Sequence, residues 1–106
     1  MKQSELYNLL KKINIPIKYR LFSKKQNPPY GIYFRTAPDN IFADDSIFSK
    51  IQNYRLEIYN DVIDRKLEEK IEQLLSENEI TYSKDEDYIE DEKKYIIYYD
   101  FTIQEE

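Results

Sequence analysis

The order of helix-like and strand-like segments constrains the fold of this chain more than any other feature. Apolar residues recur at helical spacing in two segments, Ser4 to Ile13 and Arg65 to about Glu77. Runs rich in β-branched and aromatic residues predict strands at 17–22, 30–36, 48–60, 80–89 and 95–103. The predicted order is therefore α-β-β-β-α-β-β. Because strands joined by short connections usually pair as neighbours, we expect an α+β fold, with two helices packed on a mainly antiparallel sheet of about five strands.

Capping residues predict where the two helices begin and end. Ser4 is a candidate N-cap for the first helix, and Asn14 and Pro16 end that helix, because the residue before a proline avoids the α region. Asp61 and Asp64 both offer caps for the second helix, and Asn78 is a natural stop. The glutamates of the second helix are expected to face water: Glu68, Glu69, Glu72 and Glu77.

For two of the predicted strands, the sequence also predicts which side chains share a face or where the strand is interrupted. In the strand at 17–22, alternation puts Ile17, Tyr19 and Leu21 on one side. In the strand at 80–89, the charged residues 84–86 are expected to interrupt or cap the strand.

Length limits the number of domains in the chain, and the charge distribution limits how its surface can be arranged. It has 106 residues, and we expect residues 1–106 to form a single domain. The net charge is −5, but residues 1–60 hold 10 Lys+Arg and 5 Asp+Glu, whereas residues 61–106 hold 6 and 16. The two parts therefore carry +5 and −10, which sum to −5. Either these charges are spread over a solvated surface, or the molecule has complementary poles that favour head-to-tail contacts between copies.

Missing residue types exclude most kinds of active site. The chain has no histidine and no cysteine, which removes the commonest general base, the thiol nucleophile and the usual transition-metal ligands. A single glycine cannot supply either of the glycine-rich phosphate loops. We therefore expect neither enzyme activity nor a cofactor. The first residues contain no apolar segment of the signal-peptide type, so we expect the chain to stay in the cytoplasm when it is made.

The acidic segment 85–92 is the one candidate for a metal site. Hard cations need several oxygen ligands that converge from a loop, and a calcium loop has a glycine at its sixth position. Counted from Asp85, that position is Glu90, so we expect no metal here. A solvated hairpin loop, whose like charges discourage edge pairing, is the simpler interpretation.

Basic residues are frequent between positions 11 and 25, with aromatic residues among them. Six cations of this stretch could contact phosphates: Lys11, Lys12, Lys18, Arg20, Lys24 and Lys25. The acidic balance of the whole chain argues against DNA as the main partner, so we do not expect nucleic acid to be bound. The acidic half could instead mimic DNA and block an enzyme that binds it.

Several short stretches, in one order along the chain, resemble a known family. They are IPIKYR at 15–20, PPY at 28–30, APDN at 37–40, FADD at 42–45, NYRLEIY at 53–59 and LEEKIE at 67–72. With these stretches the chain resembles the tail completion, or tail-to-head joining, proteins encoded in the head–tail modules of siphophages and prophages of Gram-positive hosts. The resemblance extends from the first helix to the last strand.

This resemblance implies a structural subunit without catalysis. Such a subunit sits, as a hexameric ring, between the head–tail connector and the tail tube, so its partners are other copies of itself, tail-tube proteins and connector proteins. It is located in the host cytoplasm during assembly and then in the tail or neck of the virion, with no part in a membrane. The alternative is a small acidic inhibitor or adaptor that binds one host protein.

The connection at 39–50 and the loop before the second strand are the expected places of contact with partners. The connection carries more apolar residues than a free loop usually does, and it either reaches a neighbouring subunit or folds back on its own core. The expected contact residues are Lys24, Lys25, Ile41, Phe42, Asp44, Asp45 and Phe48.

Overall fold

The computed structural model of the chain describes residues 1–36 and 50–105, and it confirms the predicted α+β fold and element order. Its helices are α1 (Gln3–Leu10), followed by the 3-10 turn η1 (Lys11–Ile13), and α2 (Arg65–Glu77). Its strands are β1 (Ile17–Tyr19), β2 (Tyr30–Arg35), β3 (Lys50–Asn60), β4 (Tyr82–Ile89) and β5 (Lys94–Glu105).

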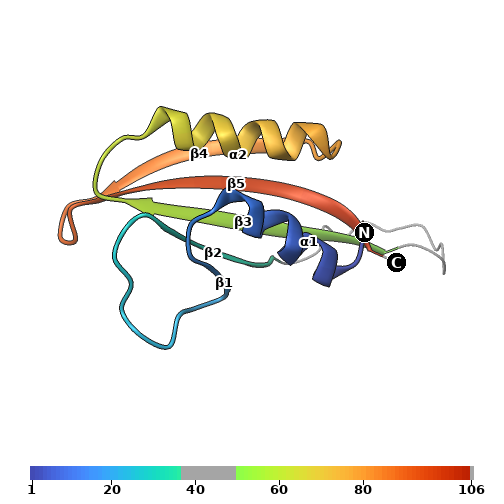
Figure 1. Ribbon diagram of the computed structural model, residues 1–106, viewed down its shortest axis with the longest axis horizontal. Helices are drawn as coiled ribbons and strands as arrows, with labels where there is room; N and C mark the ends of the chain where they lie inside the picture. The colour runs from blue at the N-terminus through green and yellow to red at the C-terminus, as the bar shows by residue number, and fades with distance from the viewer. Residues whose placement is uncertain (37–49, 106) are drawn as a thin grey trace.

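The five strands form one twisted sheet in the spatial order β1-β2-β3-β5-β4 (Figure 1). β1 runs parallel to β2, and the other three pairings are antiparallel. The long strands β3 and β5 lie at the centre, paired from Lys50 with Glu105 to Asn60 with Tyr95. Gly31 of β2 allows a close approach, because a Cβ atom there would stand 2.9 Å from Cδ1 of Ile58.

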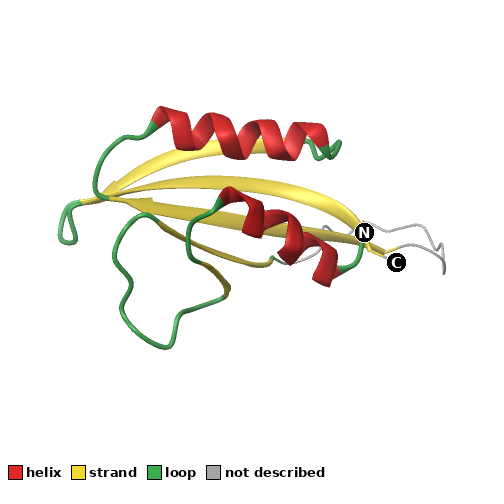
Figure 2. Cartoon of the chain, viewed as in Figure 1, coloured by secondary structure: helices red, strands yellow, loops and turns green. Residues whose placement is uncertain are grey.

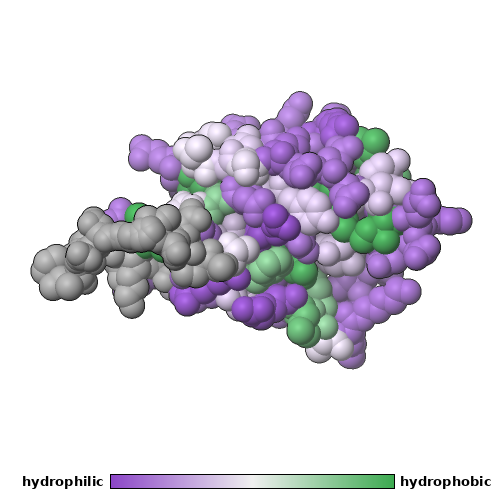
Figure 3. All heavy atoms as spheres, turned by 180° about the vertical axis from the view of Figure 1, so that it is seen from behind, coloured by the Kyte–Doolittle hydropathy of each residue, from purple (hydrophilic) through white to green (hydrophobic). Residues whose placement is uncertain are grey.

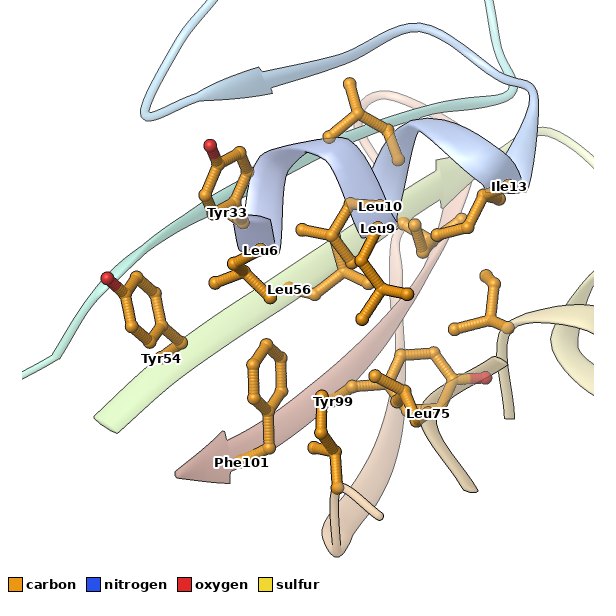
Figure 4. Close-up of a cluster of buried hydrophobic side chains, with 14 of the residues drawn as sticks. Leu6, Leu9, Leu10, Ile13, Tyr33, Tyr54, Leu56, Leu75, Tyr99 and Phe101 are labelled. Atoms are coloured by element: carbon orange, nitrogen blue, oxygen red, sulfur yellow. The ribbon is translucent and has the colours of Figure 1, made fainter. Parts of the chain in front are cut away.

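Both helices cover the same face of the sheet and leave the other face without a helix (Figures 1 and 2). Leu6, Leu9 and Leu10 point from α1 toward the strands, as Figure 4 shows. The strand residues of this core are Ile17, Tyr33, Tyr54, Leu56, Ile58, Ile97, Tyr99, Phe101 and Ile103. They alternate along their strands and lie opposite one another in the register, as expected for a half-buried sheet.

The helix ends agree with the sequence prediction for α2 and for the end of the first helix at Ile13, but the start of α1 differs. The side chain of Asp64 accepts a hydrogen bond from the backbone N–H of Leu67 at 3.1 Å, so Asp64 is the N-cap of α2. The prediction that Ser4 caps α1 is wrong, since the helix begins at Gln3. The carboxylate of Glu5 accepts from the backbone N–H of Lys2 at 2.8 Å and satisfies this end of the helix.

The first strand is shorter than predicted. It ends at Tyr19 because Arg20 has a left-handed backbone with φ of 71°, and the N–H of Leu21 turns back to the carbonyl of Tyr19 at 2.9 Å. Leu21 was expected beside Ile17, but its side chain is 69% exposed. The chain therefore leaves the sheet with an apolar residue facing solvent.

The strand at 80–89 is not interrupted by residues 84–86. β4 is continuous from Tyr82 to Ile89, and β5 pairs with it along its whole length. The pairing partner overrides the poor β propensity of these charged residues. The predicted start of β3 at Phe48 lies outside the described residues.

The glutamates at 68 and 72 are the clearest exceptions to the prediction that α2 turns its acidic residues to water. Glu68 is only 5% exposed, and Nζ of Lys84 on β4 lies 2.7 Å from its carboxylate. The same Nζ lies 2.7 Å from the carboxylate of Glu72, which also accepts a hydrogen bond from the hydroxyl of Tyr99 at 2.8 Å. These contacts, which we call the Lys84 clamp, attach α2 to the edge of the sheet.

Candidate interaction surface

The face of the sheet opposite the helices, which we call the open face, is covered by no helix among the described residues. Its side chains come from Tyr30, Ile32, Phe34, Asn53, Arg55, Glu57, Tyr59, Ser83, Asp85, Asp87, Ile89, Lys94, Ile96, Tyr98, Asp100 and Thr102. Figure 3, seen from behind, shows hydrophilic residues over most of this side and hydrophobic residues in small, separate areas. Such a mixed surface is typical of protein interfaces that form and dissociate.

One end of the open face carries a small aromatic cluster. The rings of Tyr30 and Tyr59 stack in parallel with centroids 5.0 Å apart, and the ring of Phe22 meets that of Tyr30 edge to face at 5.7 Å. Ile96 pairs with Tyr59 in the register and is 2% exposed, although it lies outside the main core. The stacked rings thus form a packed aromatic surface, which we call the floor, and they bury an apolar residue on the side away from the helices.

Tyr59 is held as a neutral phenol in this cluster. Burial, and next the hydrogen bond that its hydroxyl donates to Glu57 at 2.7 Å, raise the pKa of Tyr59 well above its ordinary value. The floor therefore keeps its charge state across the neutral pH range.

A groove of about 400 Å³ opens above this floor. Arg20, Lys24 and Lys25 belong to one wall, in the loop that follows β1, and Glu92 and Lys94 belong to the other. None of the ion pairs within residues 1–36 and 50–105 includes Lys24 or Lys25, whereas Lys94 lies 3.8 Å from the carboxylate of Glu92. With four cationic side chains and one carboxylate, the groove is electropositive in a chain that is acidic as a whole.

The opposite edge of the sheet, β4, is acidic. Asp85 accepts from the backbone N–H of Glu86 at 2.9 Å, and Asp87 accepts from that of Tyr88 at 2.8 Å. Two main-chain donors of this edge strand are thereby satisfied within the strand, which reduces its capacity to pair with a strand of another molecule. The segment 85–92 is thus not a hairpin loop as predicted, since residues up to Ile89 are strand and only the rest form the turn.

The two kinds of charge that the sequence divides between its halves are also separated in space. The sheet order puts β1 at one edge and β4 at the other. Lys18, Arg20 and the lysines at 24 and 25 lie with the β1 side, and the aspartates at 85 and 87 lie on β4. The β1 edge is therefore mainly basic and the β4 edge mainly acidic, although Lys84 lies on β4 and Glu92 lines the groove.

The structure puts two of the predicted contact residues at this surface. Lys24 and Lys25 are exposed and line the groove. The other five, Ile41, Phe42, Asp44, Asp45 and Phe48, lie outside the described residues.

Sequence reasoning did not select the floor of the groove or the second wall. The alternation of β2 and β3 could have shown that Tyr30 and Tyr59 leave the core side, but their stacking depends on a strand register that the sequence does not show. Lys94 comes from a segment more than 60 residues away, and only the sheet order brings it to this groove.

The surface offers charge, aromatic rings and shape rather than reactive groups. Among residues 1–36 and 50–105, no three His, Cys, Asp or Glu side chains converge as metal ligands. Within the same residues, every buried side-chain nitrogen and oxygen has a hydrogen-bond partner. Arg55, for example, donates to both oxygens of Asp100 at 2.8 and 3.1 Å and lies over the ring of Tyr98.

Comparison with known proteins assigns no family. No family model matches the chain, and no curated protein is significantly similar to it. In the part of the chain that the structure describes, neither helix has the length and apolar content needed to cross a membrane.

Proposed function

We propose that the chain is a structural subunit of a phage head–tail junction or tail terminus, which assembles as a ring between the connector and the tail tube. The observation that carries this proposal is that one molecule has both a basic groove, between the loop after β1 and the β4–β5 turn, and acidic side chains along the β4 edge. A closed ring is built from heterologous contacts, in which two different patches of each subunit meet. The resemblance of residues 15–20, 28–30 and 53–59 to tail completion proteins points to the same role.

Electrostatics favours a head-to-tail contact over a two-fold one. In a two-fold contact through either side, a patch meets itself, so cations meet cations or carboxylates meet carboxylates. In a head-to-tail contact, the basic side of one copy meets the acidic side of the next. The charge distribution therefore supports a ring or a helical stack over an isolated symmetric dimer.

Both sides also carry an exposed apolar residue. Leu21 stands beside the basic groove, and Tyr88 on β4 is 43% exposed. An interface needs such apolar anchors, because exposed ion pairs alone contribute little free energy. The two sides thus combine steering charge with groups that can be buried on contact.

A binding measurement tests this proposal. The purified chain is mixed at low micromolar concentration with tail-tube and connector proteins encoded in the same gene cluster, and complexes are counted by native mass spectrometry. We expect assemblies that contain several copies of the chain. Absence of binding to every tail and connector protein, together with tight binding to a host enzyme, would overturn the proposal.

The acidic edge favours one alternative, a small inhibitor or adaptor that binds a basic host protein. Such a protein would use only the β4 side, whereas a ring subunit uses both sides. Amide-exchange protection on binding distinguishes the two functions. Protection confined to β4 favours the inhibitor, and protection of both β4 and the loop at 20–26 favours the ring subunit.

A further inference from the structure

We infer that the groove on the open face is the docking site for the β4 edge of a second copy of the same chain. This inference rests on the proposed function, since it names the two surfaces through which neighbouring subunits meet. The groove supplies Arg20, Lys24 and Lys25, and the β4 edge supplies Asp85 and Asp87.

The cations of the groove wall are available to a partner. Lys24 and Lys25 are exposed and form no ion pair within the described part of the chain, and the guanidinium of Arg20 lies 5.6 Å from the centroid of the Tyr19 ring. A concave site with four cationic side chains and a single carboxylate, Glu92, attracts an anionic surface.

The floor of the groove argues against nucleic acid as the occupant. Single strands bind to protein surfaces by stacking bases on free aromatic faces. Here the ring of Tyr30 is stacked on Tyr59, approached by the edge of Phe22 and lies 5.4 Å from Nζ of Lys94. The net charge of −5 also opposes a long polyphosphate, so an acidic protein surface fits better.

The β4 edge has the properties of a matching partner. Its carboxylates are held in place, because Asp85 and Asp87 each accept a backbone N–H of their own strand at 2.9 and 2.8 Å. The exposed ring of Tyr88 lies on the helix side of the same strand, against Tyr95, so the open-face apolar residue next to these carboxylates is Ile89. Asp85 and Asp87 are not among the residues that line the groove, although Ile89 at the end of the same strand is, so each molecule offers both a groove and an acidic edge to further copies.

Charge-swapped variants test the contact. K24E/K25E gives a groove that repels the acidic edge, and D85K/D87K gives an edge that repels the basic groove. Each variant alone is expected to self-associate at least about tenfold more weakly than the wild type in sedimentation equilibrium at low salt. An equimolar mixture is expected to associate again, because each reversed site then meets a complementary one.

Two further measurements separate the contact from a folding defect and from a different partner. D85N/D87N retains an oxygen that can accept the two backbone N–H groups while removing the charge, so it should keep the wild-type melting temperature and still associate more weakly. Zero-length carbodiimide cross-linking of ¹⁵N-labelled and unlabelled copies should join Lys24 or Lys25 of one copy to Asp85 or Asp87 of another.

Several outcomes would overturn the inference. They are a wild type that stays monomeric at several hundred micromolar, a mixture of the swapped variants that does not associate, or binding of a single-stranded oligonucleotide that K24E/K25E abolishes. The proposed function is judged separately, by the binding of tail-tube and connector proteins. A chain that binds those proteins but does not self-associate refutes only the docking of one copy on the next.

Discussion

Two leucines show how differently single residues act in this molecule. Leu10 on α1 is fully buried, whereas Leu21, just after β1, is 69% exposed. Leu10→Ala should lower the free energy of unfolding by about 2–5 kcal/mol, because it removes buried apolar contacts and leaves a cavity. Leu21→Ala should change it by less than about 0.5 kcal/mol. Urea unfolding of both variants measures the difference, and an equal loss in the two would contradict the assignment of Leu21 to the surface.

Lys84 neutralises the buried negative charge of α2. Its ammonium group pairs with both Glu68 and Glu72, while Arg65 also contacts Glu68 at 3.0 Å. Lys84→Met leaves a buried carboxylate with one partner fewer, so we expect a loss of about 1–3 kcal/mol. Lys70→Met, on an exposed position of the same helix, is the matched control and should be close to neutral. Thermal unfolding of the two variants decides whether the Lys84 clamp stabilises the fold.

At the scale of elements, the start of α2 depends on a single cap. The sequence offers Asp61 and Asp64, and only Asp64 accepts the N–H of Leu67. Asp64→Ala should therefore cost about 1 kcal/mol, and Asp61→Ala should cost much less. Guanidinium unfolding of the two variants checks this, and a larger effect at Asp61 would mean that the helix begins elsewhere.

The elements themselves could be predicted from the sequence to a large extent. The apolar stripe of α2 and its flanking Asp and Asn give its bounds directly, and the alternation in β3 gives its buried side. The end of β1 could not be predicted, because Arg20 has a left-handed backbone that is uncommon for residues other than glycine. The continuity of β4 depends on β5, a partner that local propensity does not include.

The candidate surface was predictable only in part. Exposed lysines in a loop suggested Lys24 and Lys25, since charged loop residues are available for contacts. The groove in which they lie also needs Tyr59 and Lys94, which come from distant parts of the chain. Glu68 was wrongly expected in water because its partner Lys84 is also distant, so helical periodicity alone placed it on the outside.

For the molecule as a whole, the Lys84 clamp makes the stability of the fold depend on pH. Burial opposes ionisation of Glu72, but the hydrogen bonds from Lys84 and Tyr99 outweigh it and lower the pKa of Glu72 below its ordinary 4.5. A lowered pKa contributes stability above pH 4.5, and that contribution is lost as the pH falls through the value in the folded state. Unfolding should therefore become easier below about pH 4.5.

Glu72→Gln isolates this effect. The variant has no carboxyl group at this position to protonate, so its stability should fall less between pH 7 and about pH 3 than that of the wild type. Urea unfolding at the two pH values measures the difference. An equal fall in both proteins would mean that other carboxylates account for the acid sensitivity.

The central claim about the whole molecule is that the chain joins phage heads to tails as a structural subunit. If the chain has this role, its gene lies in a phage or prophage, and deleting it there, followed by negative-stain electron microscopy of the lysate, tests the claim most directly. The proposed function predicts filled heads and separate tails in the deletion, and joined particles when the wild-type gene is supplied in trans. Joined, infective particles in the absence of the chain would contradict it.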